Sequence, residues 1–278
     1  MAEPTAPRAL RPARLFACTP SRLAAFDCPR RYWFTYVRRP AAQKGLPWAH
    51  NSLGAAAHLA LARWWSLARV ARTPAAGALL VERNWDSSGF RDDTQAARHR
   101  AQAARWVRQY LIGQDPDREP AGVERTVGVP AGRLALSGRV DRIDERDAEL
   151  VVVDYKTGRN EPSEHDARGS LALALYVLGT RRTLRRACRR VELHHLPSGR
   201  VTAFEHTEAS LARHLARAEA TAQDIVTAVD TLESGASPDE VFAPAPGPGC
   251  AWCDFRAHCP DGQAVSDELD PWAGLAGE

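Results

Sequence analysis

The stretches GRVDRID, residues 138–144, and VVVDYKTGR, residues 151–159, decide the fold. Both are rich in β-branched residues and alternate apolar with polar positions, a pattern that is typical of strands. The polar residues between them, ERDA, fit a tight hairpin loop at 145–148. The sequence therefore predicts two successive antiparallel strands, over 133–144 and 149–155.

Two aspartates converge on one face of this predicted hairpin. If paired positions have numbers that sum to about 293, Asp141 faces Val152 and lies diagonal to Asp154, with Lys156 one step further on the same face. Carboxylates brought together in a folded protein are costly unless a cation lies between them. Carboxylate oxygens and waters are the ligands that Mg²⁺ or Mn²⁺ prefers, and such an ion also acidifies bound water. The hairpin therefore predicts a divalent metal site.

Lysine is rare in this chain, since only Lys44 and Lys156 stand among 37 basic residues. The ammonium of Lys156 can orient or deprotonate a water molecule, whereas a permanently charged guanidinium cannot act as a base. The alternative is an ordinary ion pair between Asp154 and Lys156 on an edge strand, which is the commoner meaning of a lone DxK tripeptide. The motifs around this tripeptide favour the catalytic interpretation.

GRVDRID followed by VVVDYKTGR resembles the PD-(D/E)XK nuclease superfamily, and within it the RecB-like exonuclease branch that includes the CRISPR-adaptation exonucleases. The likeness covers most of the chain. It implies an α/β restriction-endonuclease-type core with a mixed sheet flanked by helices, and a nuclease that hydrolyses phosphodiester bonds. The family also has a helical G-x-x-x-H pattern, matched here by GAAAH at 54–58. The resemblance therefore implies that His58, Asp141 and Asp154 hold the metal, with the Tyr155 carbonyl as a further ligand.

Further positions extend the comparison with that family. Glu124 matches an acidic residue that supports the metal site, and Tyr176 fits the tyrosine of a helical Q-x-x-x-Y motif. Ala172 stands where this motif has Gln, a departure that bears on strand preference or rate rather than on the metal site. The residues implied to act in catalysis are Lys156, Asp154, Asp141, Glu124 and Tyr176, and the candidates for contacts to the DNA backbone are Arg139, Arg142 and Arg159.

Six cysteines occur, three of them in the C-x2-C-x5-C run of GCAWCDFRAHCP, residues 249–260. Such close spacing in a cytosolic chain favours a metal over disulfides. Four thiolates suit a [4Fe–4S] cluster or a tetrahedral zinc, for which His258 is another candidate ligand. The RecB-like resemblance implies iron–sulfur and one early cysteine with three late ones. The implied ligands are Cys28, Cys250, Cys253 and Cys259, which would join the N-terminal helices to the C-terminal segment. We interpret Cys18 and Cys188 as ordinary small residues.

Composition indicates a globular protein. With 278 residues, of which 44% are hydrophobic, the chain can bury a sizeable core in one or two domains. No apolar run approaches the length of a membrane span, and the N-terminus lacks the apolar region of a signal peptide. We therefore expect a cytoplasmic protein without a membrane partner.

The sequence also divides the chain into segments. These are a disordered N-terminus (1–14), a helical region with Cys28 and His58 (15–112), the α/β nuclease core (113–240), the cysteine segment (241–261) and a loosely held acidic tail (262–278). The expected helices span 52–70, 93–112, 170–178 and 207–233, and the other expected strands span 123–129, 191–195 and 201–204.

The resemblance implies DNA as the substrate, as single strands or ends, and a role in repair or recombination. No G-x-x-x-x-G-K-[ST] loop is present, so unwinding would need a helicase partner. The alternatives are a CRISPR-adaptation nuclease, or an inactive DNA-binding or adaptor module with a structural iron–sulfur or zinc site. Decay should remove metal ligands first, so the presence of the whole set favours catalysis. An arginine-rich run over 181–190 could follow a nucleic-acid backbone, although a solvated helix face is the favoured interpretation.

Overall fold

The computed structural model describes residues 16–275, and the N-terminal segment expected to be disordered lies outside them. One mixed sheet organises this part of the chain, in the order β1-β3-β4-β5-β6, with β2 paired to β3. The strands are β1 (Phe16–Cys18), β2 (Gly122–Ala131), β3 (Leu134–Arg146), β4 (Glu149–Lys156), β5 (Cys188–His195) and β6 (Val201–Glu205). β1 is parallel to β3 and β4 to β5, while the other pairs are antiparallel. The predicted mixed sheet flanked by helices is confirmed.

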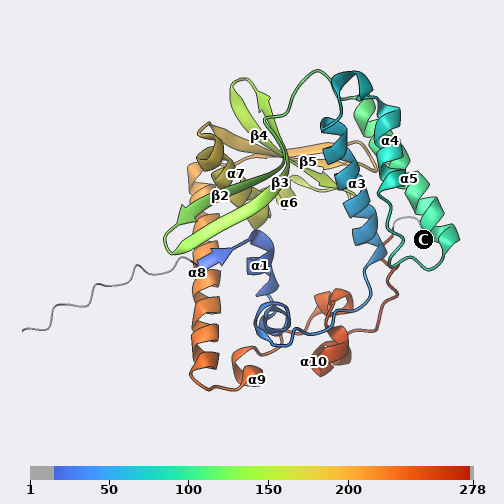
Figure 1. Cartoon of the computed structure of the whole chain (residues 1–278). Coiled ribbons are helices and arrows are strands. Elements are labelled where there is room, and N and C mark those ends of the chain that lie inside the picture. The colour runs from blue at the N-terminus through green and yellow to red at the C-terminus, as the bar shows by residue number, and fades with distance from the viewer. Residues whose placement is uncertain (1–15, 276–278) are drawn as a thin grey trace, which may run out of the picture.

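Helices cover both faces of this sheet. Figure 1 shows α3, α4 and α5 together on one side and α7 with α8 on the other. The main helices are α3 (Ala49–Trp65), α4 (Pro74–Arg83), α5 (Asp93–Ile112), α6 (Glu164–Gly169), α7 (Leu171–Leu184) and α8 (Glu208–Glu233). Shorter helices are α1 (Pro20–Ala25), α2 (Pro29–Tyr32), a π-helical turn (Trp33–Val37), α9 (Pro238–Val241) and α10 (Pro260–Val265), with 3₁₀ turns at Arg69–Ala71, Pro248–Trp252 and Arg256–His258. None of the helices within residues 16–275 combines the length and apolar character of a membrane span.

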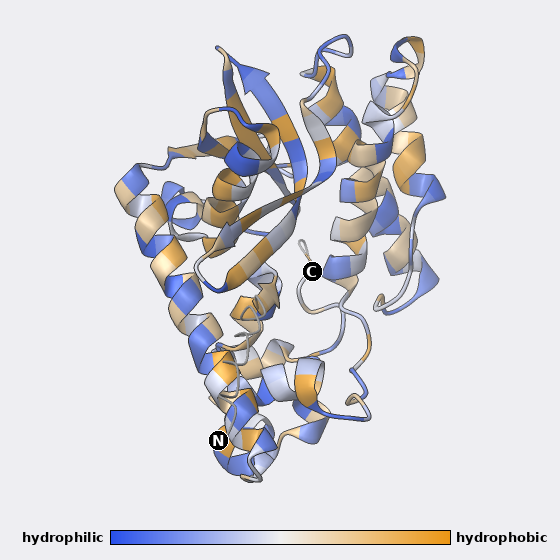
Figure 2. Ribbon diagram, turned by 60° about the vertical axis from the view of Figure 1, so that its left-hand side comes forward, coloured by the Kyte–Doolittle hydropathy of each residue, from blue (hydrophilic) through white to orange (hydrophobic). Residues whose placement is uncertain are grey.

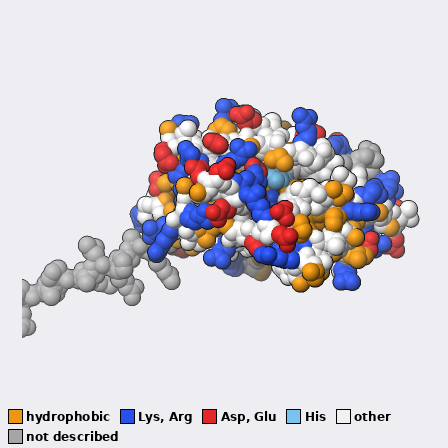
Figure 3. Space-filling view, turned by 90° about the horizontal axis from the view of Figure 1, so that it is seen from above, with side chains coloured by type: hydrophobic (Ala, Val, Ile, Leu, Met, Phe, Trp, Pro, Cys, Tyr) orange, Lys and Arg blue, Asp and Glu red, His pale blue; other side chains and the backbone are white. Residues whose placement is uncertain are grey.

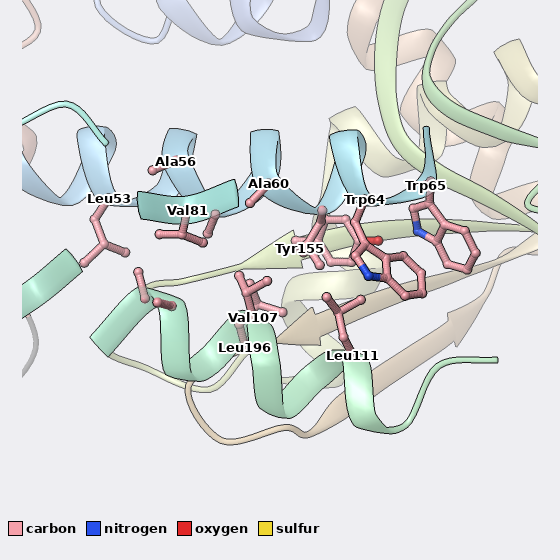
Figure 4. Close-up of a cluster of buried hydrophobic side chains, with 14 of the residues drawn as sticks. Leu53, Ala56, Ala60, Trp64, Trp65, Val81, Val107, Leu111, Tyr155 and Leu196 are labelled. Atoms are coloured by element: carbon pink, nitrogen blue, oxygen red, sulfur yellow. The ribbon is translucent and has the colours of Figure 1, made fainter. Parts of the chain in front are cut away.

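The first core lies between the sheet and the layer of α3, α4 and α5. Trp64 of α3 is fully buried against Val107 and Leu111 of α5, and the strand residues Val153 and Tyr155 close this core from the sheet side (Figure 4). A second core joins α7 to the opposite face of the sheet, and a third joins α1 and α8 to the starts of β1 and β3. Figure 2 shows the apolar residues gathered on the strands and on the inward sides of the helices. The sheet is therefore buried on both faces.

The β3–β4 hairpin has a tighter turn than the sequence suggested. Asp147 and Ala148 form it alone, with φ values of 49° and 66°, as a two-residue hairpin turn requires. Arg142 consequently pairs with Val153, a register two residues away from the predicted one. The expectation that Asp141 faces Val152 is wrong, because Val152 pairs with Ile143. The same register carries Asp141 to the position opposite Asp154, just beyond the last ladder pair.

The end of the C-terminal segment, residues 271–275, packs against the rest of the chain, whereas residues 263–270 of the expected tail are mostly exposed. The carbonyl of Pro271 accepts a hydrogen bond from the first N–H of α3, at Ala49. The carbonyl of Leu275 accepts one from the guanidinium of Arg159 at 2.7 Å, and the Leu275 side chain is only 1% exposed. Apolar burial thus outweighs the acidic composition that suggested a tail. Residues 276–278 lie outside the described residues.

Replacing Leu275 by alanine should lower the free energy of unfolding by roughly 2–3 kcal/mol, because it removes a fully buried side chain from the first core. Chemical denaturation of the full chain measures this change. The matched control is Val265→Ala on α10, whose side chain is 52% exposed and which should change stability by less than about 0.5 kcal/mol. Equal effects of the two substitutions would contradict the packed C-terminal segment.

Candidate active site

A cleft of about 1560 Å³ opens beside the ends of β3 and β4. Its walls come from α1, α3, α7 and α8, and from the C-terminal segment at Gly274 and Leu275. The loop that follows β4 contributes Thr157 and Gly158, directly after the DYK tripeptide. Residues distant in sequence therefore meet at one solvent-accessible hollow, which is where ligand and active sites of α/β proteins are usually found.

His58 reaches this cleft from the middle of α3. Its Nδ1 lies 3.2 Å from Oδ2 of Asp141. Gly54, one turn earlier, favours the close approach of α3, because a Cβ there would lie 3.1 Å from Oγ1 of Thr157. Burial alone would lower the pKa of His58, but its hydrogen bond to Asp141 and the charges of Asp141 and Asp154 raise the pKa above its usual value. The G-x-x-x-H pattern thus has a steric basis here.

The two aspartates and the lysine lie at the end of the hairpin. Asp141 Oδ2 accepts a hydrogen bond from the backbone N–H of Tyr155 at 2.9 Å, and Asp154 Oδ2 lies 2.6 Å from the ammonium of Lys156. Burial raises the pKa of Asp154. Burial also acts to raise the pKa of Asp141, but the contacts with His58 outweigh it and the pKa is lowered. Two crowded carboxylates thus take different proton affinities from their surroundings.

These side chains fit the ligand chemistry of a hard divalent cation. Within residues 16–275, no group of three or more His, Cys, Asp or Glu side chains is arranged so that it could hold a metal ion. An imidazole and two carboxylates from His58, Asp141 and Asp154 are nevertheless typical donors for Mg²⁺ or Mn²⁺. Asp154 Oδ2 is buried, and the Lys156 ammonium lies 2.6 Å from it. A cation bound here would share this oxygen with the ammonium.

The order of these residues along the chain matches a known family. The family model of the PD-(D/E)XK nuclease superfamily matches residues 17–260, which include every residue of this site. The chain belongs to the PD-(D/E)XK nuclease superfamily. A search of curated proteins found no match. Among solved structures, one titled "Crystal structure of SSO0001" is similar, with a TM-score of 0.38 and 15% identity, covering 93% of this chain and 90% of that chain.

Members of the PD-(D/E)XK superfamily typically act on nucleic acids with a divalent metal. Two further residues expected at the site, Glu124 and Tyr176, line the cleft. Glu124 adopts a φ of 46° where the β2–β3 ladder skips its pair with Asp141, and its carboxylate lies 2.7 Å from Nε of Arg139. Tyr176 of α7 covers Gly138 so closely that a Cβ there would lie 2.4 Å from its ring. Burial raises the pKa of both Glu124 and Tyr176.

The arginines predicted to contact DNA have different environments. Arg139 lines the cleft beside Glu124. Arg142 is 2% exposed, so the prediction that it contacts a DNA backbone is wrong. Arg159 donates to the Leu275 carbonyl and holds the C-terminal segment. The alternation of strand residues explains the error at Arg142, because the residue after Asp141 on β3 turns into the first core.

The arginine-rich run over 181–190 is partly exposed to solvent and paired with glutamates, in line with the interpretation as a solvated face. Arg181, Arg186, Arg189 and Arg190 each lie within 2.8 Å of a glutamate carboxylate. Figure 3 likewise shows basic side chains interspersed with acidic ones on the face seen from above. These pairs are surface or strand-edge contacts of small energetic value. They form no continuous basic track on this part of the molecule.

The four cysteines of the predicted cluster line one small cavity, although they are separated by most of the chain. Cys28 immediately precedes α2 and lines this cavity with Cys250, Cys253 and Cys259. Within residues 16–275, however, no three of them are arranged so that they could hold a metal ion. All four are free thiols and partly buried. His258 does not join them, because its Nε2 contacts the carbonyl of Gln43 at 2.8 Å.

The two remaining cysteines lie away from that cavity. Cys18 and Cys188 are buried in the third and second cores, as expected of ordinary small residues. Burial raises the pKa of the Cys188 thiol to about 12, so this thiol stays protonated and unreactive.

Gly54→Val should push α3 away from the loop after β4, since the added side chain meets Thr157. We expect a loss of about 1–3 kcal/mol in the free energy of unfolding, and a His58 pKa that falls toward its usual value as Asp141 moves away. Chemical denaturation and an NMR titration of the histidines test both effects. The control Ala55→Val also introduces a β-branched side chain into α3, but at an exposed position. A His58 pKa unchanged by Gly54→Val would contradict the steric explanation.

Proposed function

We propose that this chain is a metal-dependent deoxyribonuclease, an exonuclease of the RecB-like branch of its superfamily. The observation that carries the proposal is that His58 and Asp141 pair in one cleft, while Asp154, opposite Asp141 on the neighbouring strand, pairs with Lys156. Superfamily membership supports a phosphodiester substrate. A decayed, purely DNA-binding adaptor would not need the buried carboxylates and the ammonium to stay together, because crowded charges without a function are costly.

His58, Asp141, Asp154 and the Tyr155 carbonyl would hold Mg²⁺ or Mn²⁺. The ion, when bound, supplies a polarised phosphate and an acidified water. Lys156 would orient a water at this site, since its ammonium is anchored on Asp154 and its side chain is 46% exposed. Glu124 supports the site from the adjacent strand, with Arg139 holding its carboxylate. Tyr176 contributes a phenol beside the phosphate path.

The cleft suggests how DNA would lie. Trp106 and Tyr176 give it aromatic faces, and Arg139 and Arg217 give it basic side chains. Aromatic faces stack on unpaired bases, so we propose single strands or DNA ends as the substrate. No nucleotide-hydrolysing loop occurs in the sequence, and a helicase partner in repair or recombination would supply such strands. Ala172, at the first turn of α7, lines the cleft where related motifs have Gln.

We also propose that Cys28, Cys250, Cys253 and Cys259 hold a [4Fe–4S] cluster. Their shared cavity supports this assignment, because four free thiols from two ends of the chain reach one place. A cluster there would stabilise the junction between the N-terminal helices and the cysteine segment, where the ring of Phe34, in the π-helical turn after α2, already stacks on Phe255. Zinc in the same thiolates is the alternative that the experiment below separates.

Lys156→Ala should reduce cleavage of end-labelled DNA with Mg²⁺ or Mn²⁺ by at least about a hundredfold, since it removes the group that orients water. Lys44→Ala is the matched control, because Lys44 is the other lysine of the chain and pairs with Asp254 on the surface. Chelator should abolish wild-type activity, and the product ladder identifies an exonuclease. Wild-type protein without cleavage on any end-labelled substrate would favour the adaptor function.

Anaerobically purified protein should contain about four iron atoms and four sulfides per chain and absorb broadly in the visible range. Cys28→Ala should remove most of the iron and lower the thermal midpoint, because one ligand and the link to α2 are lost. The control is Cys18→Ala, a buried thiol outside the cavity. Zinc in place of iron in the wild-type protein, or equal iron in both variants, would contradict the assignment.

A further inference from the structure

A buried polar network lies behind the two strands that carry the aspartates. Its centre is Arg142, the residue after Asp141 on β3, which is 2% exposed. A fully buried guanidinium is unusual, since its desolvation is costly unless every donor is satisfied. The mechanism proposed above gives this group no role.

Arg142 has partners on three sides. Its NH2 donates to Asp144 Oδ2 at 3.0 Å, and its Nε lies 2.8 Å from the other oxygen of that carboxylate. Its NH1 donates to the hydroxyls of Tyr110 at 3.0 Å and Tyr155 at 3.1 Å. The guanidinium also lies over the ring of Trp65, 5.6 Å from its centre. Arg142 is therefore fixed by contacts with a strand and two helices.

The network continues away from the cleft. The hydroxyl of Tyr110 lies 2.8 Å from Nδ1 of His194, whose Nε2 lies 2.9 Å from Glu192. Glu192 is bound in turn by Arg146 at 2.6 Å and Arg190 at 2.8 Å. The opposing charges hold the pKa of the Glu192 carboxyl well below its usual range. These contacts make the network a rigid support that spans β3, β4, β5 and α5.

Tyr155 connects this support to the candidate metal site. Its hydroxyl is held by Arg142, its backbone N–H donates to Asp141, and its ring meets the His58 ring edge-on at 5.7 Å. It also lies between Asp154 and Lys156 on β4, so any movement of Tyr155 moves both neighbours. One residue thus contacts or adjoins every group proposed to bind the metal.

We propose that Arg142 and the Tyr155 hydroxyl are positioning groups that set the geometry of the metal site from behind. The inference rests on the proposed function, since it concerns the affinity of the same site. Arg142 fixes the Tyr155 side chain, and Tyr155 fixes Asp141 through its N–H and His58 through its ring. Groups that orient metal ligands typically change metal affinity by 10- to 100-fold when removed.

The test compares two phenols that share one donor. Tyr155→Phe and Tyr110→Phe each remove a hydroxyl bonded to Arg142 NH1, at 3.1 and 3.0 Å, but only Tyr155 belongs to the strand of the site. We expect Tyr155→Phe to weaken Mn²⁺ binding to the full chain at least about tenfold. Tyr110→Phe should change it less than about twofold. Electron paramagnetic resonance of free Mn²⁺ measures affinity without relying on cleavage, and denaturation reports the stability of both variants.

A second variant tests the role of Arg142 itself. Arg142→Lys keeps the charge but cannot bond both phenols and Asp144 at once, so it should weaken Mn²⁺ binding as Tyr155→Phe does. The double variant Arg142→Lys/Tyr155→Phe should bind Mn²⁺ no more weakly than the weaker-binding single variant, because both changes break the same contact between Arg142 and the Tyr155 hydroxyl. Equal losses from Tyr155→Phe and Tyr110→Phe, or additive losses in the double variant, would overturn the positioning role. No Mn²⁺ binding by the wild-type chain would instead overturn the metal site itself, and the inference with it.

Discussion

The end of the β3–β4 ladder is the constraint on which the rest of the structure depends. Two-residue hairpin geometry carries Asp141 and Asp154 to facing positions immediately past the last pair, Arg142–Val153. Two buried carboxylates at facing positions repel each other, so groups that compensate their charge have to lie beside them. His58 lies on α3, where Gly54 leaves room for the side chain of Thr157. The cleft, the helix packing and the C-terminal segment all adjoin this point.

The charged side chains on the two faces of the hairpin have different partners. On one side Asp141 has His58 and the backbone N–H of Tyr155 as close partners, and Asp154 has Lys156. On the other side Arg142 is bonded by groups from three elements. A guanidinium that several elements hold at once resists rearrangement. The Arg142 network therefore gives this part of the hairpin a rigid backing.

Local patterns predicted much of this architecture. The helix expected over 93–112 is α5 itself, the strand pair is present, and the four residues expected at the site do meet. The predictions were wrong where contacts between residues distant in sequence determine the structure. The hairpin turn has two residues rather than four, which changes the strand register. Burial of Leu275 fixes the end of a segment whose composition predicts a loosely held tail. The contact between Tyr110 and His194 joins residues 84 positions apart, and no periodicity in either segment indicates it.

The use of basic residues at this site follows from their chemistry. Arginine stays charged at any accessible pH and offers a planar set of donors, which suits Arg142 because a support should neither titrate nor rotate. Lysine has one compact ammonium on a flexible stem, which suits the role we propose for Lys156, in which the ammonium orients a water while it is anchored on Asp154. Exchanging the two would leave the buried phenols with too few donors and the cleft with a cation unable to release a proton. A chain that uses arginine almost everywhere thus has a physical reason to keep lysine at position 156.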